Sequence, residues 1–283
     1  MVLNENKEKL HKNSLYDLNK NNHIKKFWVG LLEGDGSIIV RRNRNNKVYG
    51  CFTISLKYLQ TNKHMLEIIS EVLGGRIYYE KKKNVIIKVN WVAVSKKDFN
   101  NCYAILQKYP LLTSKKICQL QHLQQCLFNQ DWDYHLKTRS QKFITQKNKI
   151  NYYEKFFVLP DYFDSWLSGF IEAEGCFRYR KKPSVSQVAA NSASLRSVKE
   201  SFYISQNSDY YILNAIKQFF NENHKIGIHK DDTHIAIHYR ISFSGKPFIK
   251  KILDHLTKYP LLGEKKRLFL LWKKAPILSR SLY

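Results

Sequence analysis

The sequence WVGLLEGDG occupies residues 28–36, and a similar sequence, LSGFIEAEG, occupies residues 167–175. Both contain small residues four positions apart: Gly30 and Gly34 in the first, Gly169 and Ala173 in the second. Residues four apart share one face of an α-helix, and small side chains there let two helix backbones approach closely. The two stretches therefore predict two helices that pack on each other.

Further matches follow both stretches in the same order. Phe52–Leu56 corresponds to Phe202–Gln206, and Tyr109–Leu112 corresponds to Tyr259–Leu262. Segments with helical spacing and segments with alternating apolar residues lie between these matches. Each copy therefore reads helix, two strands, helix, two strands, helix. We expect an α+β fold of two αββαββα half-domains related by a pseudo-two-fold axis.

The repeat also predicts the domain boundaries. We expect an N-terminal arm at 1–25, a first half-domain at 26–128, a charged and irregular linker at 129–161, and a second half-domain at 162–283. The N-terminus has neither the apolar run of a secretory signal nor the Arg-rich, acid-poor composition typical of a mitochondrial transit peptide.

The chain is strongly basic. Its 283 residues contain 48 Lys and Arg against 23 Asp and Glu, a formal net charge of +25. This excess implies a polyanionic partner, with nucleic acid as the first candidate and an anionic membrane surface as the second. No apolar run approaches the roughly 20 residues that a membrane-spanning helix needs, so an integral membrane protein is excluded.

Cysteine and histidine spacing argues against common zinc motifs. The five cysteines are scattered, with no C-x-x-C pair, and the ten histidines show neither H-E-x-x-H nor C2H2 spacing. We therefore expect buried, reduced thiols, and we expect any metal chemistry to use oxygen ligands.

Two acids occupy the same position in the repeated stretches. Asp35 and Glu174 each precede a glycine that ends the helix and begins a strand. Two close carboxylates at helix C-termini repel each other, but together they favour a divalent cation. Such a site on a basic surface suits phosphodiester hydrolysis.

Two other readings of the acids stay open. Either acid alone could merely cap a turn, which is less plausible for both at once. Glu33 and Glu172, two residues earlier, are competing ligands, although we expect them to support the interface or the neighbouring helix ends.

With its two motifs at 28–36 and 167–175, the sequence resembles a single-chain, two-motif LAGLIDADG homing endonuclease over roughly residues 27–274. The first motif departs slightly from the family, with Trp28 and Val29 at its start and Glu33 for the usual Asp. The resemblance implies that the four-stranded antiparallel sheets form a saddle on DNA. It also implies Mg²⁺-dependent cleavage of both strands of a long asymmetric target by a monomer, leaving 3′ overhangs. Ca²⁺ is expected to occupy the same sites without supporting cleavage.

The resemblance also assigns roles to individual residues. Asp35 and Glu174 bind metal, helped by the backbone carbonyls of Gly34 and Ala173. Lys115 and Lys265 lie near the scissile phosphates, where an ammonium group offsets transition-state charge. Gln206 orients a catalytic water. Its counterpart is Leu56, which cannot hydrogen bond, so the two strands are expected to be cut at unequal rates.

Strand alternation selects the DNA-binding face. Counting by twos from the two metal-binding acids, and keeping the same parity in the later strands, gives positions on one side of each sheet. In the first half these are Ser37, Ile39, Arg41, Asn43, Lys47, Tyr49, Thr53, Tyr78, Glu80, Lys82, Lys88 and Asn90. In the second half they are Cys176, Arg178, Arg180, Lys182, Lys199, Ser201, Tyr203, His229, His238 and Arg240. Lys and Arg can read guanine and Asn can read adenine, whereas phosphate contacts carry no sequence information.

Competing functions remain on the same scaffold, because a fold does not fix an activity. The first alternative is an RNA-binding intron maturase, with host intron RNA as partner, which retains or lacks cleavage. A transcription regulator without catalysis is less favoured, since both motif acids are present. Abundant Lys, Asn, Ile, Tyr and Phe have A/T-rich codons and suggest an organelle, the mitochondrion first and the chloroplast as an alternative.

Overall fold

The computed structural model describes residues 2–179, 200–229 and 237–280. The first half contains α1 (Val2–Asp35), β1 (Gly36–Arg42), β2 (Val48–Lys57), α2 (Gln60–Leu73), β3 (Arg76–Lys82), β4 (Val85–Ala93), α3 (Lys96–Lys108) and α4 (Ser114–Asn129). The second half contains α7 (Phe163–Glu174), β5 (Gly175–Tyr179), β6 (Glu200–Asn207), α8 (Tyr210–Phe219), β7 (Ile226–His229), β8 (His238–Ser244), α9 (Lys246–Lys258) and α10 (Glu264–Arg280). The predicted order is confirmed, and each half ends with one additional helix.

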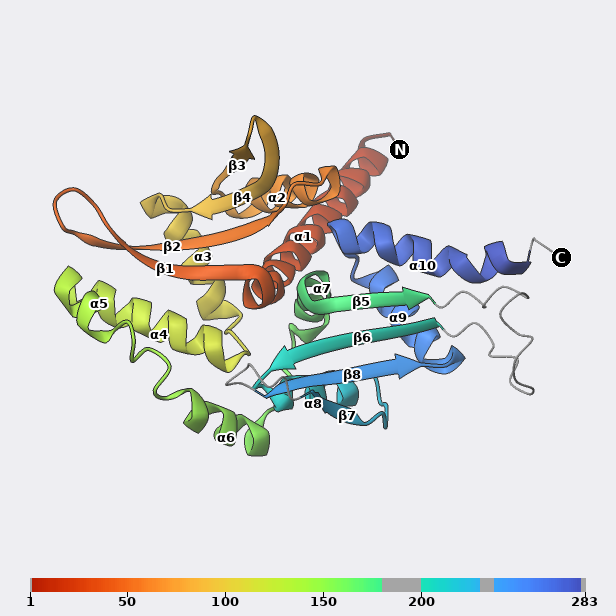
Figure 1. The fold of residues 1–283 in the computed structure, drawn as a ribbon. Helices are drawn as coiled ribbons and strands as arrows, with labels where there is room; N and C mark the ends of the chain where they lie inside the picture. Colours follow the sequence, from red (N-terminus) through yellow and green to blue (C-terminus); the bar gives the residue numbers. More distant parts are fainter. Residues whose placement is uncertain (1, 180–199, 230–236, 281–283) are drawn as a thin grey trace.

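Two four-stranded antiparallel sheets form the body of the protein. Their strand orders are β1-β2-β4-β3 and β5-β6-β8-β7, so the two halves have the same topology. The sheets lie on either side of the α1–α7 helix pair (Figure 1). The predicted two-half α+β architecture is therefore confirmed.

The contact between α1 and α7 depends on glycine. A Cβ atom added to Gly30 would overlap the carbonyl oxygen of Trp166, and one added to Gly169 would overlap the carbonyl oxygen of Phe27. Further along the seam, a Cβ on Gly34 would overlap that of Ala173. The small residues therefore allow the two backbones to touch, as the four-residue spacing predicts.

Aromatic side chains fill the space between each sheet and its helices. In the first half, Trp28 packs edge-on against Phe52 and Trp91, with ring centroids 5.9 Å apart in both pairs. In the second half, Phe243 stacks on Phe248 at 4.2 Å. These rings are fully buried, so they fix α1 to the first sheet and α9 to the second.

The segment between the halves is not irregular, and that part of the prediction is wrong. It contains α5 (Trp132–Thr138) and α6 (Gln146–Phe156). The Asp131 carboxylate accepts hydrogen bonds from the backbone N–H groups of Asp133 and Tyr134, a typical N-cap. Neither helix has a fully buried residue, so neither leaves a strong apolar period in the sequence.

Three other features bear on the sequence predictions. Helix α1 continues without a break through residue 25, where the arm was expected to end. All five cysteines are free, and all but Cys176 are buried. None of the helices formed by the described residues combines the length and apolar character needed to cross a bilayer.

Candidate nuclease site

The two motif acids lie at the C-terminal ends of the paired helices. Asp35 ends α1 and Glu174 ends α7, and each is followed directly by the first residue of a strand. The Cβ position of Gly34 is 3.4 Å from Glu174 Oε1, so the seam brings the two helix ends together. Asp35 is exposed and Glu174 is half-buried.

The electrostatic environment of these acids is that of a cation site. Loss of solvent raises the pKa of both carboxyls, and the nearby Asp35 raises the pKa of Glu174 further, while Lys265 and Lys116 act in the opposite direction. Within the described part of the chain, neither carboxylate has a hydrogen-bond or ion-pair partner. Two close carboxylates without partners supply the oxygen ligands that hard divalent cations prefer.

A lysine lies beside each acid, but in the first half it is not the expected one. Lys116 is buried and donates a hydrogen bond to the carbonyl oxygen of Gly36, whereas Lys115 is exposed. In the second half, Lys265 donates in the same way to the carbonyl oxygen of Gly175. Lys116, and not Lys115, is therefore the structural counterpart of Lys265.

This difference is not caused by a shift of the helix start. The sequence repeat aligns Lys115 with Lys265, because both follow the Tyr-Pro segment by the same number of residues. Both helices begin at the same repeat position, α4 at Ser114 and α10 at Glu264, yet the lysine that reaches the start of the strand is one residue later in α4 than in α10. A fixed offset cannot detect this difference.

Burial alters the Lys116 ammonium group. Loss of solvent and the neighbouring Lys115 lower its pKa to about 8, while Glu33, Asp35 and Glu174 act in the opposite direction. Its positive charge therefore depends on the acids of the site.

Glu33 and Glu172 bind helix N-termini, as expected. Glu33 accepts hydrogen bonds from the backbone N–H groups of Leu112 and Thr113 and from the indole N–H of Trp166. Glu172 accepts from the backbone N–H groups at the start of α10: those of Leu262 at 3.3 Å, Gly263 at 3.1 Å and Lys265 at 2.8 Å. These buried carboxylates fix the ends of α4 and α10, which carry the two lysines.

The start of each lysine-bearing helix is also bound by the opposite half. The Asp209 carboxylate accepts hydrogen bonds from the backbone N–H and the hydroxyl of Ser114. Thr61 donates its hydroxyl to the Glu264 carboxylate at 2.7 Å, and Asn62 Oδ1 accepts from the Glu264 backbone N–H at 3.2 Å. Sequence analysis did not identify these residues, because the contacts join segments that are distant along the chain.

Gln206 lies near this cross-domain contact. Its amide nitrogen is 3.5 Å from Asp209 Oδ2, a long hydrogen bond. By strand parity it is on the opposite side of the sheet from Tyr203. Its role in orienting water remains a prediction.

The first sheet presents most of its predicted DNA contacts on one face. The register pairs Ser37 with Thr53 and Arg41 with Tyr49, while the intervening Ile38 is buried. In β4, Asn90 and Lys88 continue the same face, where Asn90 is the register partner of Tyr78 and Lys88 that of Glu80. Ile39, which is half-buried, points to this face as well, because it lies two residues from both Ser37 and Arg41.

Several predicted positions in this half differ from a side chain that is free to contact DNA. Lys88 Nζ is 3.1 Å from Glu80 Oε2, so these two side chains bind each other. Asn43 Oδ1 accepts from the backbone N–H of Lys47 and so stabilises the β1–β2 loop in which both residues lie. A register shift after Glu80 means that counting by twos no longer assigns Lys82 to this face.

The second sheet shows a similar face around Tyr203. The guanidinium carbons of Arg178 and Arg240 lie 4.6 and 4.9 Å from the centre of its ring. Cys176 and Ser201 share this face by register, and His238 Nδ1 is 2.7 Å from Asn207 Oδ1. His229, the last residue of β7, pairs with His238, the first residue of β8. Arg180, Lys182 and Lys199 lie outside the described residues.

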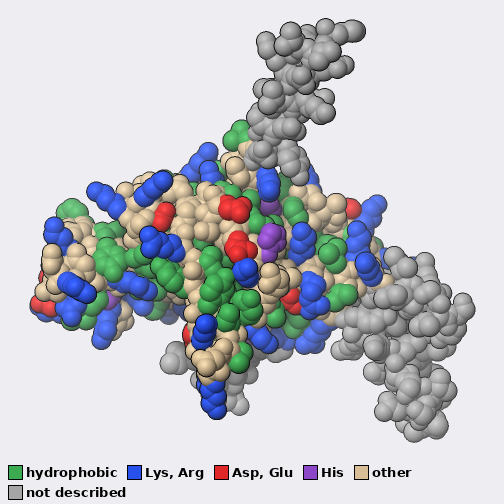
Figure 2. Space-filling view, turned by 90° about the horizontal axis from the view of Figure 1, so that it is seen from above, with side chains coloured by type: hydrophobic (Ala, Val, Ile, Leu, Met, Phe, Trp, Pro, Cys, Tyr) green, Lys and Arg blue, Asp and Glu red, His purple; other side chains and the backbone are tan. Residues whose placement is uncertain are grey.

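The charge distribution fits a polyanionic ligand. Figure 2 shows one face on which Lys and Arg side chains are widely spread, with a few acidic side chains near its middle. A broad positive field attracts a phosphate backbone without regard to sequence.

Comparison with known proteins gives matches along most of the chain. The profile of the family described as LAGLIDADG endonuclease matches residues 28–126 and 167–276. A probable intron-encoded endonuclease of Debaryomyces hansenii is 34% identical over 281 residues, covering 88% of this chain and 37% of its own length. One of Dictyostelium citrinum is 36% identical over 247 residues, covering 87% of this chain and 92% of its own length. The chain thus spans little more than a third of the first relative and nearly all of the second.

Two further matches are more distant. An uncharacterized mitochondrial protein of Saccharomyces cerevisiae is 28% identical over 192 residues, covering 63% of this chain and 37% of its own length. The crystal structure of the LAGLIDADG homing endonuclease I-GzeII in complex with its DNA target superposes with a TM-score of 0.64 at 21% identity, covering 91% of both chains. This superposition shows a shared fold.

Proposed function

The chain belongs to the LAGLIDADG endonuclease family, and on that premise we propose that it is a site-specific homing endonuclease that makes a double-strand break in a long asymmetric DNA target. It hydrolyses one phosphodiester bond in each strand and leaves 3′ overhangs. The observation that carries this proposal is the pair Asp35 and Glu174, brought together at the ends of α1 and α7 with one buried or half-buried lysine beside each.

The residues present fit a hard divalent cation. Asp35 and Glu174 are carboxylates without other partners in the described chain; loss of solvent raises the pKa of both, and the nearby Asp35 raises the pKa of Glu174 further. The backbone carbonyls of Gly34 and Ala173 are the additional oxygen ligands that we propose. With Mg²⁺ bound, the site would supply activation of a water and stabilisation of charge on the phosphate, whereas Ca²⁺ would occupy it without supporting cleavage.

The side chains around the acids have separate tasks. Lys116 and Lys265, each fixed by a backbone carbonyl next to an acid, offset the negative charge that develops on the phosphate. Gln206 orients the water in one half. Leu56 has no polar group for this task, and so one strand is cut faster than the other.

The sheets and their basic loops bind the duplex. Arg178, Arg240 and Tyr203 form one cluster on the second sheet, and Arg41 and Tyr49 lie side by side on the first. Positive side chains of this kind supply phosphate affinity, and a smaller number read base edges. Both halves are present in one chain, so we propose that the monomer is the active species.

The proposed location is the mitochondrion. The A/T-rich codon preference of the composition and the similarity to a yeast mitochondrial protein support it. The chloroplast, which the sequence left as an alternative, has no support among the relatives.

The deciding experiment is cleavage of plasmids that carry candidate insertion sites, with Mg²⁺ present. A linear product from one site, dependent on Mg²⁺ and on both acids, is expected. Tight DNA binding without any double-strand product would refute nuclease activity. Preferential binding of intron RNA under the same conditions would point to the maturase alternative.

A further inference from the structure

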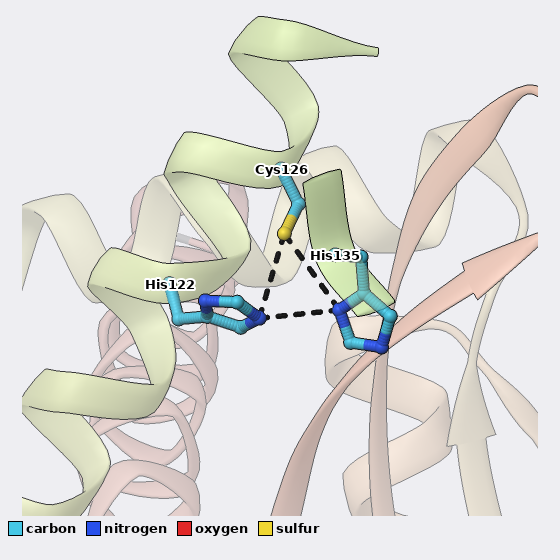
Figure 3. Close-up of side chains that lie close together, drawn as sticks. All are labelled: His122, Cys126 and His135. Atoms are coloured by element: carbon cyan, nitrogen blue, oxygen red, sulfur yellow. Dashed lines mark hydrogen bonds between the residues drawn. The ribbon is translucent and has the colours of Figure 1, made fainter. Parts of the chain in front are cut away.

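A cluster of three metal-ligating side chains lies apart from the carboxylate site. His122 and Cys126 come from successive turns of α4, His135 comes from α5, and the three side chains point toward one another (Figure 3). His122 Nε2 is 3.1 Å from His135 Nδ1, and Cys126 Sγ is 3.5 Å and 3.7 Å from these two nitrogens. Among the described residues, no other group of three His, Cys, Asp or Glu converges in this way.

The dimensions of this triangle match tetrahedral zinc. Zn–N bonds of about 2.0–2.1 Å and a Zn–S bond of about 2.3 Å, at tetrahedral angles, place the nitrogens about 3.4 Å apart and the sulfur about 3.6 Å from each. The observed distances of 3.1, 3.5 and 3.7 Å are close to these values. An ion therefore fits at the centre of the cluster with little movement of the backbone.

The three groups supply the kinds of donor atom that zinc prefers. A donor set of two imidazoles and one thiolate favours zinc over the hard cations that carboxylates bind.

A polar group lies near the place where a fourth ligand of the ion would bind. A cavity of about 290 Å³ adjoins the cluster and is lined by His122, His135 and Gln119. Gln119 Oε1 is buried and has no hydrogen-bond partner. An unsatisfied buried acceptor is costly, and a water on the metal would donate to it.

We infer that His122, Cys126 and His135 bind one Zn²⁺ ion, with a water in the fourth position that donates a hydrogen bond to Gln119. The ion joins the first helix of the linker segment to α4. Helix α5 in turn contacts the end of β1, where the Arg42 guanidinium lies 5.1 Å from the centre of the Trp132 ring. The ion therefore steadies the β1–β2 hairpin of the proposed DNA-binding face.

The sequence contained a signal for this site that standard motifs do not include. His122 and Cys126 are four apart, which places both on one face of a helix, and His135 follows nine residues later. The prediction that metal chemistry would use only oxygen ligands excluded the site too broadly.

The test uses the full chain, stripped with a chelator and kept in excess Mg²⁺ so that the carboxylate site is saturated. Cobalt(II), a spectroscopic substitute for zinc, is titrated in. We expect one equivalent to give the visible bands of tetrahedral cobalt and a sulfur-to-cobalt charge-transfer band, both lost when Zn²⁺ is added. Zinc at a hundredfold excess over its Kd is expected to raise the melting temperature by about 5–10 °C.

Two variants and one control assign the ligands. C126S and H135Q are each expected to abolish the charge-transfer band and the zinc-dependent rise in melting temperature. C118S retains both, because Cys118 is a buried thiol on the same helix that contacts Thr145 and not the cluster. If C126S fails to fold, H135Q still tests the site, because His135 is only half-buried and its replacement should disturb the fold less. Absence of the band in the wild type, or its persistence in either variant, would overturn the inference.

Discussion

The ammonium group of Lys116 donates a hydrogen bond to the carbonyl oxygen of Gly36, the residue that follows Asp35. Lys265 makes the same bond to Gly175 after Glu174. The two lysines therefore occupy equivalent places in space beside the two acids, although the sequence repeat does not align them.

We expect K116M to lower the cleavage rate by about 10²–10³-fold, the usual cost of removing one preorganised donor at a developing charge. K115M is the matched control, because Lys115 is adjacent in sequence but exposed; its effect should stay below about tenfold. Single-turnover cleavage of a duplex labelled on each strand measures both rates. A larger loss for K115M than for K116M would restore the assignment made from the repeat.

The two motif acids should be needed for chemistry more than for binding. D35N or E174Q is expected to lower cleavage by about 10³-fold or more, because each removes a charged ligand of the proposed cation site. DNA affinity in Ca²⁺ should change only a few-fold, and E71Q, at an exposed acid on α2, should change neither. Double-strand cutting at normal rates by D35N would remove Asp35 from the mechanism.

The glycine seam gives a prediction about stability. G30A should lower the free energy of unfolding by about 1–3 kcal/mol, because its Cβ would overlap the backbone of α7 at Trp166. G227A is the control: its Cβ would have its nearest neighbour at 3.7 Å. Urea unfolding compares the two, and an equal effect at both positions would contradict close backbone packing at Gly30.

A buried histidine predicts a loss of stability in acid. Burial, with the nearby His23 and Lys258, lowers the pKa of His255 to about 3. Between about pH 6.5 and 3 the unfolded chain binds a proton there that the folded chain does not, which costs about 1.4 kcal/mol per pH unit. The slope of unfolding free energy with pH should be smaller by this amount in H255Q, whereas H64Q, at an exposed site, should keep the wild-type slope.

The cluster around Tyr203 should contribute to DNA affinity. Arg240 lies over the Tyr203 ring, and its buried Nε has no hydrogen-bond partner among the described residues. R240A is expected to weaken DNA binding. If Arg240 contacts a phosphate, the slope of the logarithm of the binding constant against the logarithm of the salt concentration should also fall by about 1 in magnitude. R267A is the control, since Arg267 already binds Glu264. Unchanged affinity in R240A would place the duplex elsewhere.

Much of the architecture could be predicted because it is repeated. Gly30 and Gly169 indicated the helix seam, and their positions before Asp35 and Glu174 indicated where the acids would meet. Strand parity from Asp35 also placed Ser37 and Arg41 on the exposed face.

The features that could not be predicted depend on three-dimensional details. The choice between Lys115 and Lys116 depends on which side chain of α4 reaches the start of β1. The face on which Lys82 lies depends on a shift in strand register after Glu80, and strict alternation of side chains along the strand cannot predict such a shift. The helices of the linker have no fully buried residues, so their apolar pattern was too weak to separate them from an irregular segment.

The contacts of Asp209 with Ser114, and of Thr61 and Asn62 with Glu264, cross between the halves in both directions. Each half thus holds the lysine-bearing helix of the other. Hybrid enzymes that join one half of this chain to half of a relative must therefore match these side chains as well as the helix seam. Recombination at the linker alone would leave both lysine-bearing helices without these contacts from the opposite half.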